Sequence, residues 1–427
     1  MSWNLPEPLE DPLWALARRC ALDPRPTRMD LVLGVYRNED GLSPVMAAVL
    51  EAEQRLVDRA PSKEYKGLAG NPAFNALMSG LILGPELDTP RTRAFQTVAG
   101  TGALRMLAEL IARSNPQAAI LIGTPSYANH IPIFEAAGLK VRTYQYLDAD
   151  GRPSAPSILS AIRDARKDDV ILLQGCCHNP TGTDIPPALW QEIAHALAQT
   201  GVIPLVDLAY YGLGNGLDED LAGARTLAAS LPRVLLAVSC SKAFSLYSER
   251  VGCAIVVANP SEAARAAGTL ETVARSAYSQ PPEHGAAIVA EILADHSLKS
   301  AWLSELNAMR ERLTQLRTWL VDGLQAAEPG FNWQPLAERR GMFTTLPLAP
   351  AQMEYLAGAH GIYGTPQGRI NLAGISSRNL PRVVEAVAAA VQTAGSGTNP
   401  GRRADGVDGA VGNYLGVRSG IKDRVPG

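Results

Sequence analysis

The sequence predicts an α/β protein with a large domain built on a mainly parallel seven-stranded sheet and a smaller α+β domain. Three observations support this fold class. Short apolar runs alternate with segments of helical periodicity from about residue 95, which is typical of βα units. A long helical stretch, residues 284–327, then precedes a region of mixed helical and strand-like segments. The 427 residues suffice for one large and one smaller domain.

Residues 1–40 are expected to form an N-terminal arm and part of the small domain. An amphipathic segment, residues 12–20, is followed by prolines at positions 24 and 26. We expect this arm to contact another subunit. Further along, residues 44–59 have helical spacing, and a glycine-bearing loop carries Tyr65, which could equally be a packing residue.

The large domain is expected over residues 41–295. Ligands bind at the carboxyl ends of the strands in mainly parallel sheets. Because several apolar runs end in polar or glycine-rich motifs, we expect the functional site at that edge. The strands are predicted at Phe95–Val98, Ala119–Ile122, Val141–Tyr144, Val170–Leu173, Ile203–Val206, Val234–Val238 and Ala254–Val257.

The small C-terminal domain is expected over residues 296–394. Two strand-like segments, residues 341–346 and 368–374, precede a helix predicted over residues 380–391. Residues 395–427 are rich in glycine and have no hydrophobic period, so we expect a flexible tail.

The composition indicates small-molecule partners. Charged residues make up 19% and the formal net charge is -3, so no basic field favours nucleic acid or an anionic membrane. The five cysteines form no even framework and no C-x-x-C pair, which argues for a reducing compartment and against a structural zinc site. No apolar stretch reaches the roughly 18 residues of a membrane span. We therefore expect a soluble, cytoplasmic protein.

A glycine-rich segment, residues 99–105, follows a predicted strand and opens a predicted helix. Backbone N–H groups and the helix dipole favour an anion at such a position. Gly100 and Thr101 are therefore candidates for phosphate binding, although an ordinary tight turn would explain this segment equally well.

Polar side chains follow two further strands. Asn179 lies in a proline-containing turn, where its amide could bind a planar ligand or simply stabilise the turn. Asp207 follows a buried strand directly, so its carboxylate must be paired, and a cationic ring nitrogen would serve. Tyr210, three residues later, could donate to the same ligand.

The stretch from Ser239 to Arg250 contains Lys242, which follows another apolar run. Most lysines are exposed, and a surface lysine is the simple alternative. A lysine next to a core strand can instead act as a neutral amine nucleophile, and Arg250 can hold phosphate. An imine-forming lysine, an acid for a pyridinium nitrogen and an anion cradle are what pyridoxal phosphate requires. Metal and dinucleotide sites are disfavoured, because clustered ligands and a G-x-G-x-x-G motif are missing.

These motifs resemble those of the aspartate/aromatic amino acid aminotransferase family, the class I aminotransferases that depend on pyridoxal phosphate. The order and spacing match across roughly residues 10–394. The resemblance implies the type I fold of such transferases, ping-pong transamination, and a homodimer with shared active sites. The matching segments are Tyr65–Gly70, Gly100–Arg105, Pro125–His130, Gly175–Gly182, Asp207–Tyr210, Ser239–Lys242, Glu249–Gly252, Arg275–Pro282 and Gly368–Asn371.

The resemblance also assigns roles around the cofactor. Lys242 would bind it covalently and later carry the proton to and from the substrate α-carbon. Asp207 would keep the pyridine nitrogen protonated, with His130 behind it, and Tyr210 and Asn179 would bind the phenolic oxygen. The phosphate would be held by Gly100, Thr101, Ser239, Ser241 and Arg250, joined by Tyr65 of the neighbouring subunit.

On the substrate side, Arg369 would clamp the α-carboxylate with help from Asn179. Arg275, also from the other subunit, would meet the distal carboxylate of aspartate, glutamate or 2-oxoglutarate, with an interface ion pair as the alternative. A desolvated guanidinium needs a matching carboxylate, so dicarboxylates are favoured unless an aromatic group displaces it. Gly34 and Tyr127 complete the expected substrate site.

Three positions depart from the family pattern. Tyr127 replaces the usual tryptophan over the cofactor ring, Gln174 a histidine near the aspartate, and Gln280 an asparagine. These residues leave the cofactor assignment unchanged but leave the amino donor open among aspartate, an aromatic amino acid and a specialised one. The alternatives are an enzyme of this fold that performs β-decarboxylation or elimination and, from another class, a non-catalytic ligand-binding protein.

Overall fold

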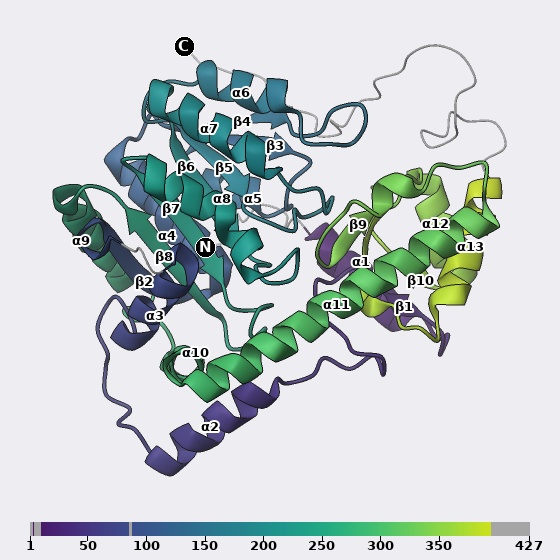
Figure 1. Ribbon diagram of the computed structural model, residues 1–427, viewed down its shortest axis with the longest axis horizontal. Coiled ribbons are helices and arrows are strands. Elements are labelled where there is room, and N and C mark those ends of the chain that lie inside the picture. The colour runs from purple at the N-terminus through teal and green to yellow at the C-terminus, as the bar shows by residue number, and fades with distance from the viewer. Residues whose placement is uncertain (1–2, 4–9, 85–87, 394–427) are drawn as a thin grey trace.

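The computed structural model describes residues 3, 10–84 and 88–393, and its centre is a seven-stranded sheet (Figure 1). The strand order is β2-β8-β7-β6-β5-β3-β4. Strand β8 pairs antiparallel with β2 and β7, whereas the other neighbours pair in parallel. The predicted α/β class is confirmed, and every predicted run lies within one strand. The bounds are β2 Thr92–Val98, β3 Ala119–Thr124, β4 Lys140–Gln145, β5 Val170–Gln174, β6 Ile203–Leu208, β7 Val234–Ser239 and β8 Val251–Val257.

Helices cover both faces of this sheet, which explains why its central strands are apolar throughout. In β7, Val234 and Leu236 belong to one hydrophobic cluster and Leu235 and Ala237 to another, because successive side chains of a strand point to opposite faces. One face is covered by α4 Ala99–Ser114, α5 His130–Glu135 and α9 Pro260–Ala277, and the other by α3 Pro72–Leu83, α6 Ala155–Arg163, α7 Pro187–Thr200, α8 Leu217–Ser230 and α10 Glu283–Ala294.

The longest helix, α11 (His296–Ala327), runs from the neighbourhood of α2 (Ala47–Arg59) and α10 toward a smaller group of elements (Figure 1). It begins after Asp295, whose carboxylate accepts a hydrogen bond from the Leu298 N–H. The smaller group contains a parallel pair, β1 with β10, and an antiparallel pair, β9 with β11. Its elements are β1 Met29–Asp30, β9 Phe343–Thr345, α12 Pro350–His360, β10 Ile362–Tyr363, β11 Arg369–Asn371 and α13 Leu380–Thr393, and the 3₁₀ turns are Thr89–Arg91, Gln334–Leu336 and Leu372–Gly374.

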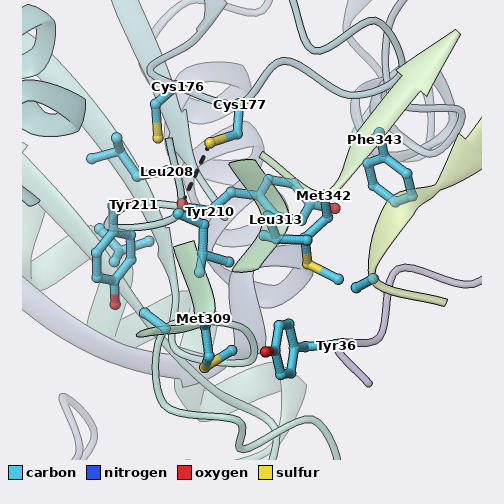
Figure 2. Packing of buried hydrophobic residues seen from close by; sticks show 14 of the residues in the cluster. Tyr36, Cys176, Cys177, Leu208, Tyr210, Tyr211, Met309, Leu313, Met342 and Phe343 are labelled. Atoms are coloured by element: carbon cyan, nitrogen blue, oxygen red, sulfur yellow. Dashed lines mark hydrogen bonds between the residues drawn. The ribbon is translucent and has the colours of Figure 1, made fainter. Parts of the chain in front are cut away.

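The interface between α11 and the large sheet is a buried cluster of aromatic and sulfur-containing side chains (Figure 2). The rings of Tyr210 and Phe343 pack edge to face with their centres 5.8 Å apart. The Cys177 thiol donates to the Tyr210 carbonyl at 3.7 Å. This packing joins the end of β6 to β9.

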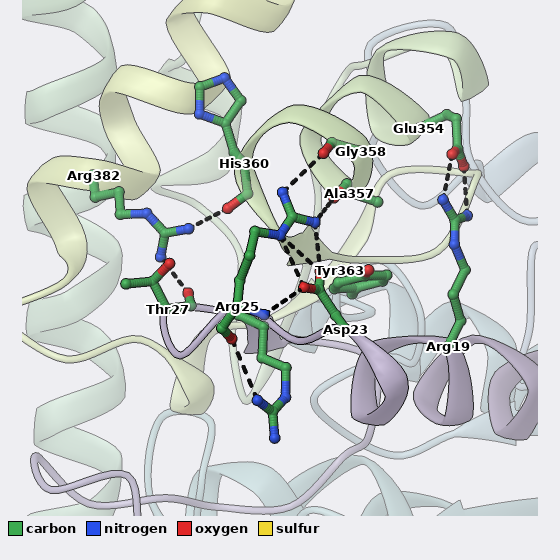
Figure 3. Close-up of polar contacts among 11 residues, drawn as sticks. Arg19, Asp23, Arg25, Thr27, Glu354, Ala357, Gly358, His360, Tyr363 and Arg382 are labelled. Carbon is green, nitrogen blue, oxygen red and sulfur yellow. Dashed lines mark hydrogen bonds and ion pairs between the residues drawn. The ribbon is translucent and has the colours of Figure 1, made fainter.

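Polar contacts fasten the N-terminal helix α1 (Pro12–Leu22) and the residues after it to α12, β10 and α13 (Figure 3). Arg19 pairs with Glu354, and Arg25 donates to the carbonyls of Ala357 and Gly358, each at 2.8 Å. The Tyr363 hydroxyl donates to Asp23 at 2.8 Å. These contacts lie within one chain, and the expected contact of the arm with another subunit remains a prediction.

The structure leaves two predictions from the sequence untested. The predicted tail, residues 395–427, is outside the described residues, and the domain boundaries near residues 41 and 296 remain predictions. Among the helices in the described ranges, none is both long and apolar enough to cross a membrane.

Candidate active site

A cavity of about 320 Å³ lies at the carboxyl edge of the large sheet, between this edge and the smaller group of elements. This is the edge at which the sequence predicts the functional site. The predicted site residues that line the cavity are Gly34, Gly100, Thr101, Tyr127, Asn179, Asp207, Tyr210, Ser239, Ser241, Lys242, Arg250 and Arg369.

One end of the cavity has the features of a phosphate cradle. The N-terminus of α4 presents Gly100 and Thr101, and a side chain at Gly100 would lie only 2.9 Å from Cβ of Ser239. Arg250 Nη1 donates to the Ser241 hydroxyl at 3.4 Å. A helix N-terminus, hydroxyls and a guanidinium together suit a phosphate dianion.

The carboxylate of Asp207 is supported from behind. His130 is fully buried, with Nε2 3.1 Å from Asp207 Oδ2 and Nδ1 2.8 Å from the Ser126 hydroxyl. If Nε2 carries the proton, the imidazole donates to the carboxylate while Nδ1 accepts from Ser126. This chain of hydrogen bonds holds Asp207 where a cationic ring nitrogen can bind to it.

The ammonium of Lys242 lines the same cavity, with Nζ 5.0 Å from the centre of the Tyr210 ring. Removal from bulk water lowers the pKa of Lys242 to about 8, while the charge of Asp207 opposes this shift and that of Arg250 adds to it. At pH 7 roughly one-tenth of such lysines are neutral, against roughly one in 3000 at the usual pKa. The lowered pKa therefore gives Lys242 a larger fraction of neutral, nucleophilic amine near pH 7.

This lowered pKa predicts a pH dependence for cofactor capture by the apoenzyme. Because only the neutral amine attacks an aldehyde, the rate should rise about tenfold per pH unit below pH 8 and level off above it. The measurement is the stopped-flow absorbance change on mixing apoenzyme with pyridoxal phosphate between pH 6 and 10. Asp207→Asn removes the charge that raises this pKa and should move the plateau to lower pH. A rate that keeps rising to pH 10 would contradict the prediction.

Arg369 is buried and only 5% exposed, yet no carboxylate of the described residues pairs with it. Its Nη1 donates to Asn179 Oδ1 at 3.1 Å and its Nη2 to the Val32 carbonyl at 2.6 Å, while Nε has no acceptor within the described part of the chain. The guanidinium packs on the Phe343 ring at 4.4 Å. Burial lowers its pKa. A substrate carboxylate would supply the missing counter-charge.

Gln174, which replaces the histidine of the family pattern, forms two hydrogen bonds with the backbone of Asn179. Its Nε2 donates to the Asn179 carbonyl at 2.9 Å, and its Oε1 accepts the Asn179 N–H at 2.8 Å. A neutral amide offers both a donor and an acceptor at every pH. Gln174 therefore fixes the residue that contacts Arg369.

Several residues that the sequence did not predict also line the cavity. Asp11, Leu13 and Trp14 come from the start of α1, and Trp14 is 64% exposed although it lines the cavity. Leu33 and Phe343 also contribute. A tryptophan in the predicted amphipathic segment 12–20 was the available signal, but the sequence does not show that α1 packs near the carboxyl edge of the sheet.

Besides His130, which lies behind Asp207, two predicted residues do not line the cavity of this chain. Tyr65 is 88% exposed, and Arg275 lies on the surface, where it donates to the Ser279 hydroxyl at 2.7 Å. Their segments are neighbours, because Gln280 Oε1 accepts the Lys66 N–H at 2.9 Å. The two side chains are thus exposed on neighbouring segments of the chain.

The expectation that metal ligands are not clustered needs correction. The ligand atoms of Cys176, Cys177 and Asp220 lie within 4.8 Å of one another. However, Asp220 accepts three backbone N–H groups, from Gly212, Gly214 and Asn215. The hydrogen bond with Cys176 and burial raise the pKa of the Cys177 thiol well above its usual value, which disfavours the thiolate that a metal needs. Asp220 instead stabilises the turn over residues 212–215.

Taken together, the fold and the site define a class of protein, the pyridoxal-phosphate-dependent enzymes. The phosphate cradle, the supported Asp207 and the nucleophilic Lys242 face one cavity and fit the phosphate, ring nitrogen and aldehyde of that cofactor.

The chain belongs to the family described as aminotransferase class I and II, whose sequence profile matches residues 26–387. It is 40% identical to the aromatic-amino-acid aminotransferase of Paracoccus denitrificans over 91% of this chain and 99% of that one. It is 37% identical to the aspartate aminotransferase of Escherichia coli strain K12, covering 89% and 97%. The crystal structure of the Burkholderia pseudomallei aromatic-amino-acid aminotransferase, covalently bound to pyridoxal phosphate, superposes with a TM-score of 0.89 at 36% identity, covering 91% and 100%. The predicted resemblance and the predicted pyridoxal-phosphate-dependent aminotransferase are confirmed.

Proposed function

We propose that this aminotransferase moves amino groups between a dicarboxylic or aromatic amino acid and 2-oxoglutarate by a ping-pong mechanism. The observation that carries the proposal is Arg369, a buried guanidinium with an unused Nε, in the same cavity as the nucleophilic Lys242. The two relatives named above, one for aromatic amino acids and one for aspartate, support this substrate range.

In this mechanism Arg369 and Asn179 bind the substrate, and Lys242 transfers the proton. Arg369 and Asn179 orient the substrate α-carboxylate, which places the α-carbon next to Lys242. Lys242, released as a free amine, takes the α-proton and returns it on the cofactor side. Bound pyridoxal phosphate supplies the aldehyde that captures amines and the ring that accepts the α-carbon's electrons. Asp207, held by His130, keeps the ring nitrogen protonated.

We also propose a homodimer, two domains in each chain and a cytoplasmic location. Tyr65 and Arg275, exposed on neighbouring segments, serve the active site of a second subunit in a homodimer, Tyr65 at the phosphate and Arg275 at the distal carboxylate. Residues 1–40 and 296–394 form a small domain around the two short strand pairs, and residues 41–295 form the large domain. The five cysteines, all free, support a cytoplasmic location.

The test uses the holoenzyme and a panel of amino donors with 2-oxoglutarate. Glutamate without an oxo acid should convert the cofactor from its lysine-bound to its amino form, seen as a loss of the long-wavelength absorbance band. Oxo acid formation from aspartate, tyrosine and phenylalanine then ranks the donors. No spectral change with any dicarboxylic or aromatic amino acid would contradict the proposal. Release of carbon dioxide or ammonia without oxo acid exchange would support decarboxylation or elimination instead.

A further inference from the structure

The segment of residues 31–36, which follows β1, forms part of the wall of the active-site cavity. Val32, Leu33 and Gly34 line this cavity, and the Val32 carbonyl accepts a hydrogen bond from Arg369 Nη2 at 2.6 Å. The segment belongs to neither a helix nor a strand, so no regular ladder of backbone hydrogen bonds fixes its shape. Its inward-facing carbonyls therefore need donors from elsewhere in the chain.

Asn371, on β11, supplies these donors. The residue is fully buried, and its Nδ2 donates to the Leu33 carbonyl at 2.7 Å and to the Val35 carbonyl at 2.8 Å. Its Oδ1 accepts the Ala373 N–H at 3.0 Å, and its backbone N–H donates to the Leu31 carbonyl at 2.8 Å. Because two carbonyls can face only the NH₂ group, the amide has a single satisfactory orientation.

Asn371 and Arg369 hold the same segment from the same strand. They lie two positions apart on β11, so their side chains leave the strand on one face. Arg369 binds the Val32 carbonyl, and Asn371 binds the next carbonyl along the chain. On β9, Phe343 lies opposite Asn371 and packs its ring against the Arg369 guanidinium at 4.4 Å. The position of the Val32 carbonyl, and with it the direction of the guanidinium, therefore depends on Asn371.

We propose that Asn371 is a positioning residue for the substrate α-carboxylate. It shapes the segment 31–36 so that the Val32 carbonyl holds Arg369 in the direction in which the carboxylate meets it. This inference rests on the proposed role of Arg369 in substrate binding. Asn371 does not itself line the cavity, so it acts through the segment and not by touching the substrate.

Asn371→Leu tests this role in the holoenzyme. Leucine has nearly the same size but no donor, so the carbonyls of Leu33 and Val35 lose their partner in the interior, which is costly. We expect kcat/KM for amino acids to fall about 10- to 100-fold, mainly through a higher KM. The corresponding amines, which lack the α-carboxylate, should keep their wild-type kcat/KM.

A binding measurement without turnover accompanies the kinetics. Succinate carries carboxylates but no amino group, so it can bind to Arg369 without reacting. Its Kd, measured by calorimetric titration of the holoenzyme, should rise about tenfold in Asn371→Leu. The absorbance and affinity of bound pyridoxal phosphate should stay near wild type.

Asn379→Leu is the matched control. It makes the same substitution in the same group of elements and removes the acceptor of the Ser376 N–H, now at 2.8 Å, but Asn379 does not line the cavity. It should lower the Tm and leave the preference for amino acids over amines unchanged. If Asn371→Leu does not fold, Asn371→Ser takes its place; it keeps one hydroxyl donor and should give a smaller loss in the same direction.

Three results would overturn the proposal. Equal losses for amino acids and amines would show that the substitution disturbs the whole cavity. A wild-type preference in Asn371→Leu, together with a lost preference in Arg369→Leu, would show that the role of Asn371 alone is wrong. If Arg369→Leu also kept the preference, the carboxylate clamp of the proposed function would be wrong, and the role of Asn371 with it.

Discussion

Lys242→Ala is expected to lower kcat for transamination by at least about 10⁴-fold. One side chain supplies both the amine that binds the cofactor and the base that moves the α-proton, so its removal eliminates two steps together. Its low pKa, about 8, is what allows both roles near neutral pH. The measurement is single-turnover oxo acid formation with the variant reconstituted with pyridoxal phosphate.

Lys66→Ala provides the control for this prediction. Lys66 lies in the exposed loop next to Tyr65 and does not line the cavity, so its ammonium should leave kcat unchanged. If Lys242→Ala retained more than one-tenth of the wild-type kcat, Lys242 would not be the proton-transfer group. If it retained every biological effect of the chain, the non-catalytic alternative would be supported.

Arg369→Leu is expected to lower kcat/KM for amino acids by about 10²- to 10³-fold, because truncating one partner of a buried charge pair costs about 2–5 kcal/mol. The loss should appear only for substrates that carry an α-carboxylate. We therefore compare each amino acid with the corresponding amine, which lacks this carboxylate: the large preference of the wild type for the amino acid should collapse in the variant. Arg369→Lys, which keeps the charge but not the two-pronged geometry, should fall in between.

Cofactor binding is the internal control for this second prediction. Arg369 contacts Asn179 and Val32 and packs on Phe343, away from the phosphate cradle at Gly100 and Ser241, so the absorbance and affinity of bound pyridoxal phosphate should stay near wild type. Equal losses for amino acids and amines would show that the substitution disturbs the whole cavity, and the carboxylate clamp would then be wrong.

Much of the fold was predictable because its signals are local. The five inner strands of the large sheet, β8, β7, β6, β5 and β3, are buried on both faces, so each appears as a mainly apolar run, as in Val234–Ser239. The candidate residues at their ends, such as Asp207, were predictable for the same reason, since polar side chains directly after buried strands need a partner. The helical stretch predicted over residues 284–327 corresponds to two helices, α10 Glu283–Ala294 and α11 His296–Ala327.

Other features of the site depend on contacts between residues far apart in sequence. Arg369 meets Asn179 across 190 positions, and Trp14 reaches the cavity only because α1 packs on β1 and β10. Gln174 looked like a departure from a family pattern, but its two hydrogen bonds to Asn179 make it a positioning residue. Such contacts have no periodic signature in the chain.

The sequence by itself determined the fold class, through hydrophobic periodicity that acts over short distances, and the cofactor, through motifs whose order and spacing resemble those of a known family. Only the tertiary structure decided which charges are left without partners. In the sequence, nothing distinguishes Arg317 and Arg369 from other arginines. The structure shows that both are buried and that Arg317 Nη1 and Arg369 Nε have no hydrogen-bond acceptor among the described residues. The reason is physical: desolvation and pairing depend on every element that surrounds a side chain, not on its neighbours along the chain.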